Sequence, residues 1–337
     1  MKLSLVDYSR SIAALLVASL AYAPSAGAVT VSPAFAADYT VTDLGSVAGL
    51  PTPYGGLTLL AGSTDTLLLG GAANTASGNF YTIGVTRDPG DLSITGFTGT
   101  PTPFGDIGEY NDGGVAYGPG GVLFTSRWPE NDLGQTKPGS TDEDRVDDLA
   151  ALGVAQSHSA INFVPAGFGG AGKAKIVSWS GGQWYDLLLA PDGSGTFDLV
   201  SATQVDLDLS TGAIDPLPGG PEGFVYISDD NAGFSVDSML VSDYSADRVS
   251  AYQLDGDGNP LVSTRQDFLT DLDGAEGAFI DPLTGDFLFS TFGGGNRVIR
   301  VDGFIAPPAV VPVPAAIWLF GTALVGLIGF NSRRKAA

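Results

Sequence analysis

Short apolar runs, separated by turns rich in glycine and aspartate, recur along residues 38–305, and each run has the length of a β-strand. The two clearest units span 221–252 and 275–301. Each contains three strand-like runs, and the units match in detail: Ser242 at the end of the second run of one corresponds to Ser290 in the other. The pattern predicts an all-β domain built from repeated multi-stranded units.

Looser copies of this unit lie upstream, so that five units begin near residues 55, 113, 159, 222 and 276, which are 46 to 63 residues apart. A repeat of this length with three or four strands is typical of a β-propeller, whose blades bury their faces against one another. We therefore predict a β-propeller of about five blades over 38–305, or of six if 128–158 or 192–220 contains another. A β-sandwich or a β-helix is the alternative.

The two ends of the repeat predict how the ring closes. A lone strand-like segment at 38–44 precedes the first unit, and the last unit stops after its third strand at Val301. The N-terminal strand is expected to complete the last blade, which would remove the open sheet edges. The blade layout resembles NHL, SMP-30 and related propellers, although no diagnostic motif of these families is present.

The N-terminus has the features of a secretory signal peptide. Lys2 and Arg10 precede an apolar stretch at 11–22, and a pattern of small residues at 26–28 follows Pro24. We predict a signal peptide over 1–28, with cleavage as late as residue 36 as a variant of the same interpretation. An uncleaved membrane anchor is the alternative.

The C-terminus predicts a membrane segment. A proline-rich spacer at 306–314 precedes sixteen uncharged, mostly apolar residues at 315–330, and basic residues follow. Such a stretch is somewhat short of the roughly 20 residues that span a bilayer, and the basic cluster is expected to stay cytoplasmic. We therefore expect 315–337 to be a tail with a single transmembrane helix.

The order of these C-terminal features resembles the PEP-CTERM sorting signal in its VPLPA variant. The residues that carry this resemblance are Val311, Pro312, Val313 and Pro314 before the apolar stretch, and Arg333, Arg334 and Lys335 after it. The resemblance implies processing by an exosortase, a membrane transpeptidase of Gram-negative bacteria that make extracellular polysaccharide. Val313 departs from the main type, which has glutamate there. An ordinary single-pass anchor is the alternative.

Composition excludes several kinds of binding partner and site. The chain has 37 acidic and 15 basic residues, a net charge of -22, so it offers no basic surface for nucleic acid. Because it has no cysteine, disulfides, thiolate metal sites and cysteine nucleophiles are excluded. Its single histidine, His158, excludes centres with several histidine ligands.

Two carboxylates stand at equivalent positions of the repeat, and they are the strongest candidates for a metal site. Glu222 and Glu276 begin the first strands of their units, which line the central channel of a propeller. Carboxylate oxygens facing one channel mouth can bind Ca²⁺ or another hard cation. Asp112 and His158 stand one residue earlier in their units and are expected to border the same opening. The alternative is that each glutamate bonds to backbone or to an arginine of a neighbouring blade.

Two other acidic segments are candidate calcium sites. The densest charge cluster follows residue 141. A run of charges usually forms a solvated surface, which is the alternative to a calcium site here. A short helix over the ring is expected after the cluster. The acidic members of the cluster are Asp142, Glu143, Asp144, Asp147 and Asp148. The segment 255–259 begins like a calcium loop but lacks the glycine and glutamate of an EF-hand, so we predict a hairpin turn. A turn is likewise predicted at 192–195.

Two hypotheses about function follow. The first is an exported envelope or matrix protein whose non-catalytic propeller contacts polysaccharide or other surface proteins. The second is a metal-dependent, lactonase-like hydrolase of the SMP-30 type, in which Glu222 or Glu276 acts with Asn162 or Asp243. The chain lacks the serine elbow of an α/β-hydrolase, so little else supports catalysis.

Overall fold

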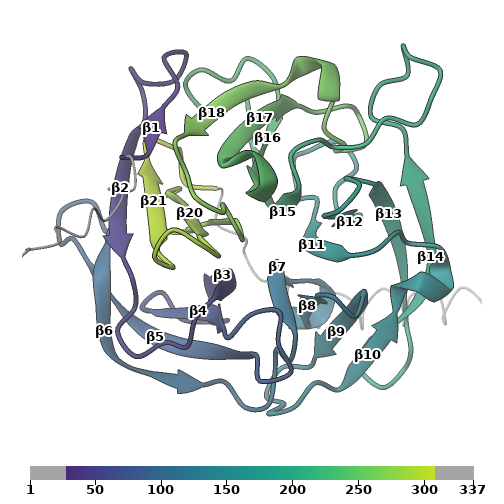
Figure 1. Cartoon of the computed structure of the whole chain (residues 1–337), viewed down its shortest axis with the longest axis horizontal. Coiled ribbons are helices and arrows are strands. Elements are labelled where there is room, and N and C mark those ends of the chain that lie inside the picture. Colours follow the sequence, from purple (N-terminus) through teal and green to yellow (C-terminus); the bar gives the residue numbers. More distant parts are fainter. Residues whose placement is uncertain (1–27, 308–337) are drawn as a thin grey trace, which may run out of the picture.

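The computed structural model describes residues 28–307, which form five antiparallel sheets around a central axis (Figure 1). This range contains no α-helix, and its four 3-10 helices are single turns. The predicted all-β propeller with five blades is therefore confirmed. The turns are η1 (Pro119–Gly121), η2 (Leu149–Leu152), η3 (Tyr244–Ala246) and η4 (Val262–Thr264).

The blades are numbered in chain order, and in each the innermost strand comes first. Blade 1 holds β3 (Tyr54–Leu59), β4 (Thr66–Gly71), β5 (Asn79–Arg87) and β6 (Ile94–Pro103). Blade 2 holds β7 (Asn111–Tyr117), β8 (Leu123–Arg127), β9 (Asp132–Thr136) and β10 (Arg145–Asp148). Blade 3 holds β11 (His158–Phe163), β12 (Ala174–Ser178), β13 (Trp184–Pro191) and β14 (Phe197–Val205). Blade 4 holds β15 (Pro221–Ile227), β16 (Ser238–Asp243), β17 (Arg248–Gln253) and β18 (Gln266–Thr270), and blade 5 holds β19 (Phe279–Ile280), β20 (Phe287–Ser290) and β21 (Val298–Asp302).

The ring closes as the repeat predicts. Strand β2 (Thr40–Gly45) pairs antiparallel with β21 and completes blade 5, with Val41 opposite Val301. A second N-terminal strand, β1 (Thr30–Val31), adds to the outer edge of blade 4 by pairing with β18, which the repeat pattern did not predict. The segment that precedes the first blade therefore fastens two adjacent blades.

No sixth blade is present between residues 128 and 158. This segment supplies β9 and β10, the two outer strands of blade 2. The helix expected there is only the single turn η2, which Asp148 caps by accepting a hydrogen bond from the backbone N of Ala150 at 2.7 Å. The segment 192–220 likewise contains β14 and a loop, so the count stays at five.

The hydrophobic core lies between neighbouring blades, which is why the domain is stable without disulfides. The largest cluster joins blades 4 and 5, where Phe268 and Phe287 are fully buried. Phe35 of the N-terminal segment packs on this cluster, with its ring centroid 5.1 Å from that of Phe268. Burial of one such side chain contributes roughly 1.5–3 kcal/mol, so the closing segment adds substantially to the stability of the ring.

Serine side chains at the ends of second strands join the blades near the axis. Ser290 of blade 5 donates to the carbonyl oxygen of Gly55 in blade 1 at 2.5 Å, and Ser242 of blade 4 donates to that of Gly277 in blade 5 at 3.2 Å. The equivalence of these serines in the repeat thus has a structural reason: each bonds to the inner strand of the next blade.

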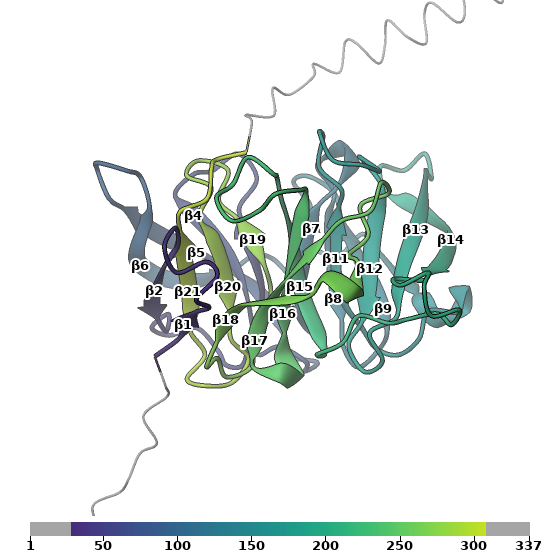
Figure 2. The same cartoon turned by 90° about the horizontal axis from the view of Figure 1, so that it is seen from above.

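All of the inner strands begin at one face of the ring, which we call the mouth, and the second strands end there. Strand β21 pairs antiparallel with β20, so it runs away from the mouth. Past its end, the backbone N of Ile305 donates to Oδ1 of Asn231, which follows the far end of β15, at 2.7 Å. The described chain therefore ends on the face opposite the mouth (Figure 2).

Candidate metal centre

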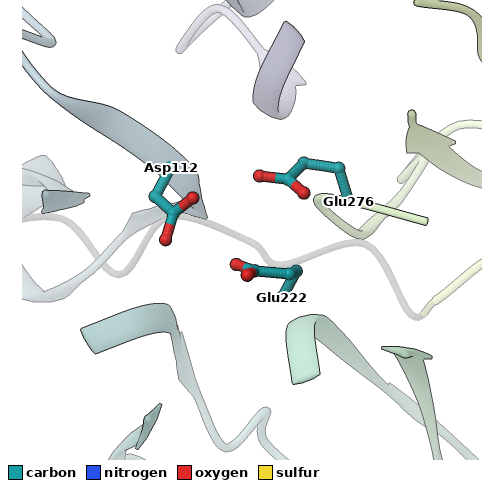
Figure 3. A group of neighbouring side chains, drawn as sticks. All are labelled: Asp112, Glu222 and Glu276. Atoms are coloured by element: carbon teal, nitrogen blue, oxygen red, sulfur yellow. The ribbon is translucent and has the colours of Figure 1, made fainter. Parts of the chain in front are cut away.

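Three carboxyl groups meet at the mouth, each on the innermost segment of a different blade (Figure 3). Asp112 lies near the start of β7, Glu222 near the start of β15, and Glu276 three residues before β19. One oxygen from each lies within 4.8 Å of the others. The structure thus brings together the two predicted glutamates and Asp112, which was expected at the same opening.

The three side chains are buried and lack cationic partners. Their exposed fractions are 1% for Asp112, 5% for Glu222 and 1% for Glu276. One oxygen of each carboxyl group has no hydrogen-bond partner, and none of the ion pairs within residues 28–307 includes any of the three. The expectation that backbone or arginine would satisfy the glutamates is therefore wrong. Carboxylates are rarely buried in this way unless they bind a cation.

Burial changes the protonation of this cluster. Loss of solvent raises the pKa of Asp112 to about 7, although hydrogen bonds from its neighbours partly oppose the shift. The pKa values of Glu222 and Glu276 rise well above their ordinary range, first because of burial and then because each carboxyl group repels Asp112. Without a cation, the cluster therefore retains protons at neutral pH. A bound cation would replace these protons.

Asn74, which the sequence did not single out, supports the centre from blade 1. In the orientation that satisfies its amide, its nitrogen donates to Oδ1 of Asp112 and to the carbonyl of Asn111, both at 3.0 Å. Blades 1 and 3 have no carboxylate at the equivalent position, where Gly55 and Ser159 stand instead. Ser159 donates to the carbonyl of Pro221 at 2.6 Å. Carboxylates thus come from three blades only.

Glycines bring the inner strands into direct backbone contact beside the carboxylates. A Cβ atom at Gly113 would overlap the carbonyl oxygen of Glu222, and one at Gly277 would lie 2.7 Å from the Cα of Gly56. Real Cβ atoms do not approach other atoms so closely, so larger residues would push blades apart. These contacts fix the backbones from which the carboxylates project.

Other residues expected at the opening lie elsewhere. His158 is buried between blades, with its ring nitrogens 3.2 Å from the carbonyl oxygens of Asp132 and Ala160, and burial lowers its pKa to about 4. Asn162 donates to the carbonyl of Phe224 at 2.9 Å, and Asp243 pairs with Arg248 at 3.1 Å. Asn162 thus bonds to the inner strand of the next blade, and Asp243 is not part of the cluster of three carboxyl groups.

The acidic run after residue 141 forms no cation site with its neighbours in the described range. Glu143 pairs with Arg127, Asp144 with Lys137 at 2.9 Å, and Asp147 with Arg145 at 2.8 Å. Asp142 accepts from Thr141 and Asp148 caps η2. Each charge thus has a local partner, as expected for a charged surface.

The two glycine-rich acidic segments are turns, as predicted. Asp255 accepts hydrogen bonds from the backbone nitrogens of Asp257 at 2.9 Å and Asn259 at 2.8 Å. Asp192 accepts one from the backbone N of Ser194 at 2.7 Å in the connection between β13 and β14. In both turns the carboxylate satisfies backbone donors of its own loop.

The leader and the sorting tail lie outside the described residues. The structure leaves out residues 1–27, which are all but the last residue of the predicted signal peptide. It also leaves out the sorting motif at 311–314 and 333–335. Between residues 28 and 307 no helix is long and apolar enough to cross a bilayer.

Comparisons with known proteins find only distant structural likenesses. The chain matches no family model and no curated protein. Among solved structures it is similar to a glutaminyl cyclase from Myxococcus xanthus, with 13% identity, a TM-score of 0.45, and 83% of this chain and 97% of that one covered. It is also similar to a PQQ-bound aldose sugar dehydrogenase from Streptomyces coelicolor (14% identity, TM-score 0.39, coverage 77% and 83%) and to an auxiliary nutrient binding protein from Bacteroides ovatus (12%, 0.42, 78% and 76%). These likenesses are too distant to bear on what this chain binds.

Proposed function

We propose that this chain is an exported envelope or matrix protein whose propeller is a non-catalytic binding module, held together at its mouth by a hard divalent cation. The observation that carries the cation is the cluster of Asp112, Glu222 and Glu276: three buried carboxyl groups, with unpartnered oxygens, within 4.8 Å of one another. A cation there would tie blades 2, 4 and 5 to one another across the axis.

Calcium suits the donor set best. All three side chains offer oxygen, the ligand atom that hard cations prefer, and Ca²⁺ tolerates the irregular geometry that three separate blades impose. Magnesium demands a closer approach to octahedral geometry. The absence of cysteine and the distance of His158 from the cluster leave no softer ligand nearby.

A lactonase-like hydrolase receives less support from this geometry. The carboxyl groups do converge with a third acid, as a catalytic metal would need, but they are only 1 to 5% exposed, so little of the cluster is open to a substrate. Asn162 and Asp243 make other contacts. A cation in this place is better suited to fixing the blades than to polarising a substrate.

The dependence of calcium affinity on pH tests the centre directly. Because the folded pKa values of Asp112, Glu222 and Glu276 are raised, the native cluster holds more protons than the unfolded chain above about pH 4. Without calcium, the cluster's contribution to stability falls as the pH rises through about 7. Calcium must displace these protons, so we expect affinity to rise at least tenfold from pH 5.5 to pH 8. Calorimetric titration in buffers of different ionisation enthalpy measures both the affinity and the protons released; a pH-independent affinity contradicts the assignment.

The sorting part of the proposal rests on the sequence of the tail. The protein is expected to be exported through the inner membrane, anchored by 315–337, and passed by an exosortase-type transpeptidase to the cell surface or matrix of a Gram-negative bacterium. Exopolysaccharide and other surface proteins are the partners we propose, and nucleic acid is not. Deleting 311–337 should release the propeller into the medium, which immunoblotting of cell fractions would measure. If the truncated protein stays in the membrane fraction, the tail is not the anchor.

A matched variant separates processing from simple anchoring. Replacing Pro312 and Pro314 with alanine leaves the apolar stretch and the basic cluster intact. A processed protein should then accumulate in the membrane at full length, whereas a plain anchor would behave as the parent does.

A further inference from the structure

Four partly exposed aromatic side chains stand at the mouth, and the proposed cation site does not use them. Trp128, Trp179, Tyr244 and Phe292 follow the second strands of blades 2, 3, 4 and 5, either directly or after one residue. We call these four residues the aromatic rim. Blade 1 has Ala72 after its second strand, so the rim is open on that side.

The rings of the rim form one continuous row. The centroid of Trp128 lies 6.5 Å from that of Trp179, which lies 6.3 Å from that of Tyr244. The centroid of Phe292 lies 5.9 Å from that of Tyr244, and all three contacts are edge-to-face. Such contacts are favourable, but they leave part of each ring in water.

The rim has no role in the hydrophobic core. None of its four side chains belongs to the five buried clusters within residues 28–307. Of the three tryptophans in this range, only Trp184 is fully buried. The indole Nε1 of Trp179 is buried and has no hydrogen-bond acceptor, so the partly exposed area of this side chain lies elsewhere on the indole. Aromatic rings kept at a surface without packing into a core are typical of binding sites.

The arginines at the mouth already have acidic partners. Arg127, which precedes Trp128, is neutralised by Glu109 at 2.8 Å and by Glu143. Arg248 pairs with Asp243, and Arg297 pairs with Asp43. Among residues 28–307, these arginines are therefore not free to bind a phosphate or an acidic polymer.

We propose that the aromatic rim binds a neutral carbohydrate chain, whose sugar rings stack on the side chains of Trp128, Trp179, Tyr244 and Phe292. Sugar rings present apolar C–H faces, which can stack on partly exposed aromatic side chains such as these four. A row across four blades fits a chain of linked rings, whereas an isolated ammonium group fits one enclosed box of aromatic faces. The inference rests on the proposed function, because it names the ligand class of the binding propeller.

The place where the described chain ends agrees with this role. The described chain ends on the face opposite the mouth, where Ile305 bonds to Asn231. In a protein anchored by its C-terminus, the rim would therefore face away from the membrane, toward extracellular polymer.

An array of neutral, acidic and cationic glycans, followed by fluorescence titration of the purified propeller, tests the proposal. We expect neutral oligosaccharides to bind and to change the tryptophan emission. Trp128→Ala and Trp179→Ala should each weaken binding at least tenfold, and Trp179→Phe should recover part of the loss. Leu188→Ala, an exposed apolar position on β13 away from the mouth, is the matched control and should bind as the parent does.

Specific outcomes would overturn the proposal. The carbohydrate proposal is excluded if no neutral glycan binds, or if both tryptophan variants keep the affinity of the parent. It is also excluded if the protein responds to choline, a cationic ligand, but not to neutral sugars. Thermal melts with calcium and with EDTA keep the two proposals separate. A tryptophan variant should lose sugar binding and keep its calcium-dependent shift. If the parent binds sugar but shows no calcium shift, the cation centre fails and the rim remains.

Discussion

Glu222→Gln and Glu276→Gln variants are expected to lose the stabilisation that calcium gives to the parent protein. Glutamine keeps the size of the side chain and one oxygen, but it removes the negative charge that holds a divalent cation in a buried site. A ligand present at a hundred times its dissociation constant stabilises a protein by about 2.7 kcal/mol. At roughly 2–4 °C per kcal/mol, the parent should melt about 5–10 °C higher with calcium than with EDTA. Differential scanning calorimetry measures this shift.

The behaviour of the same variants in EDTA distinguishes a lost cation from a damaged fold. Each glutamine removes repulsion within the cluster, because Glu222 and Glu276 both have carboxyl groups that face Asp112. At pH 8 the variants in EDTA should therefore melt at or above the temperature of the parent in EDTA. Asp142→Asn, in the exposed acidic run, is the control and should keep the full calcium shift. A shift that survives in both glutamine variants and disappears in Asp142→Asn would place calcium in that run instead.

The five blades and both glutamates were predictable because they repeat. Glu222 and Glu276 each precede a glycine at the start of an inner strand, and this short motif aligns without gaps. Asp112 holds the same place in blade 2, but the register of β7 shifts between Asn111 and Val115, where the strand contains an extra glycine. The alignment therefore set Gly113 at the equivalent position and placed Asp112 only at the border of the site.

His158 shows the opposite error. Strand β11 also has an irregular register, between His158 and Ala160. The imidazole lies between blades, where the backbone carbonyls of Asp132 and Ala160 face it. Strand β15 has the same irregularity between Pro221 and Gly223, so what sets His158 apart is its place one residue before Ser159, the residue aligned with Glu222.

The aromatic rim and the acidic run were missed or left open for a different reason. Trp128, Trp179, Tyr244 and Phe292 follow the second strands of their blades, so a careful alignment of strand ends would have found them. The partners of the acidic run could not be found in this way. Its acidic members pair within blade 2, but Arg145, which lies among them, also bonds to Asp198 of blade 3 at 2.8 Å, and no local pattern encodes which strands become neighbours.

Gly113→Ala is expected to destabilise the propeller and to weaken the cation centre in one step. The added methyl group would overlap the carbonyl oxygen of Glu222, so that blades 2 and 4 must separate. Overpacking of this kind costs about 1–3 kcal/mol or more. Because Glu222 would move with its backbone, calcium affinity should fall together with the free energy of unfolding, which a urea titration with and without calcium measures.

Gly256→Ala is the matched control for this substitution. Gly256 has no atom within 4 Å of an added Cβ and lies in the surface turn of 255–259, so its replacement should change the free energy of unfolding by less than about 0.5 kcal/mol. If Gly113→Ala unfolds as the control does, the inner strands are not in the close contact described. If it is destabilised but keeps the full calcium affinity, the position of Glu222 does not govern the centre. The two measurements together therefore test whether the glycine contacts between blades also set the geometry of the carboxylates.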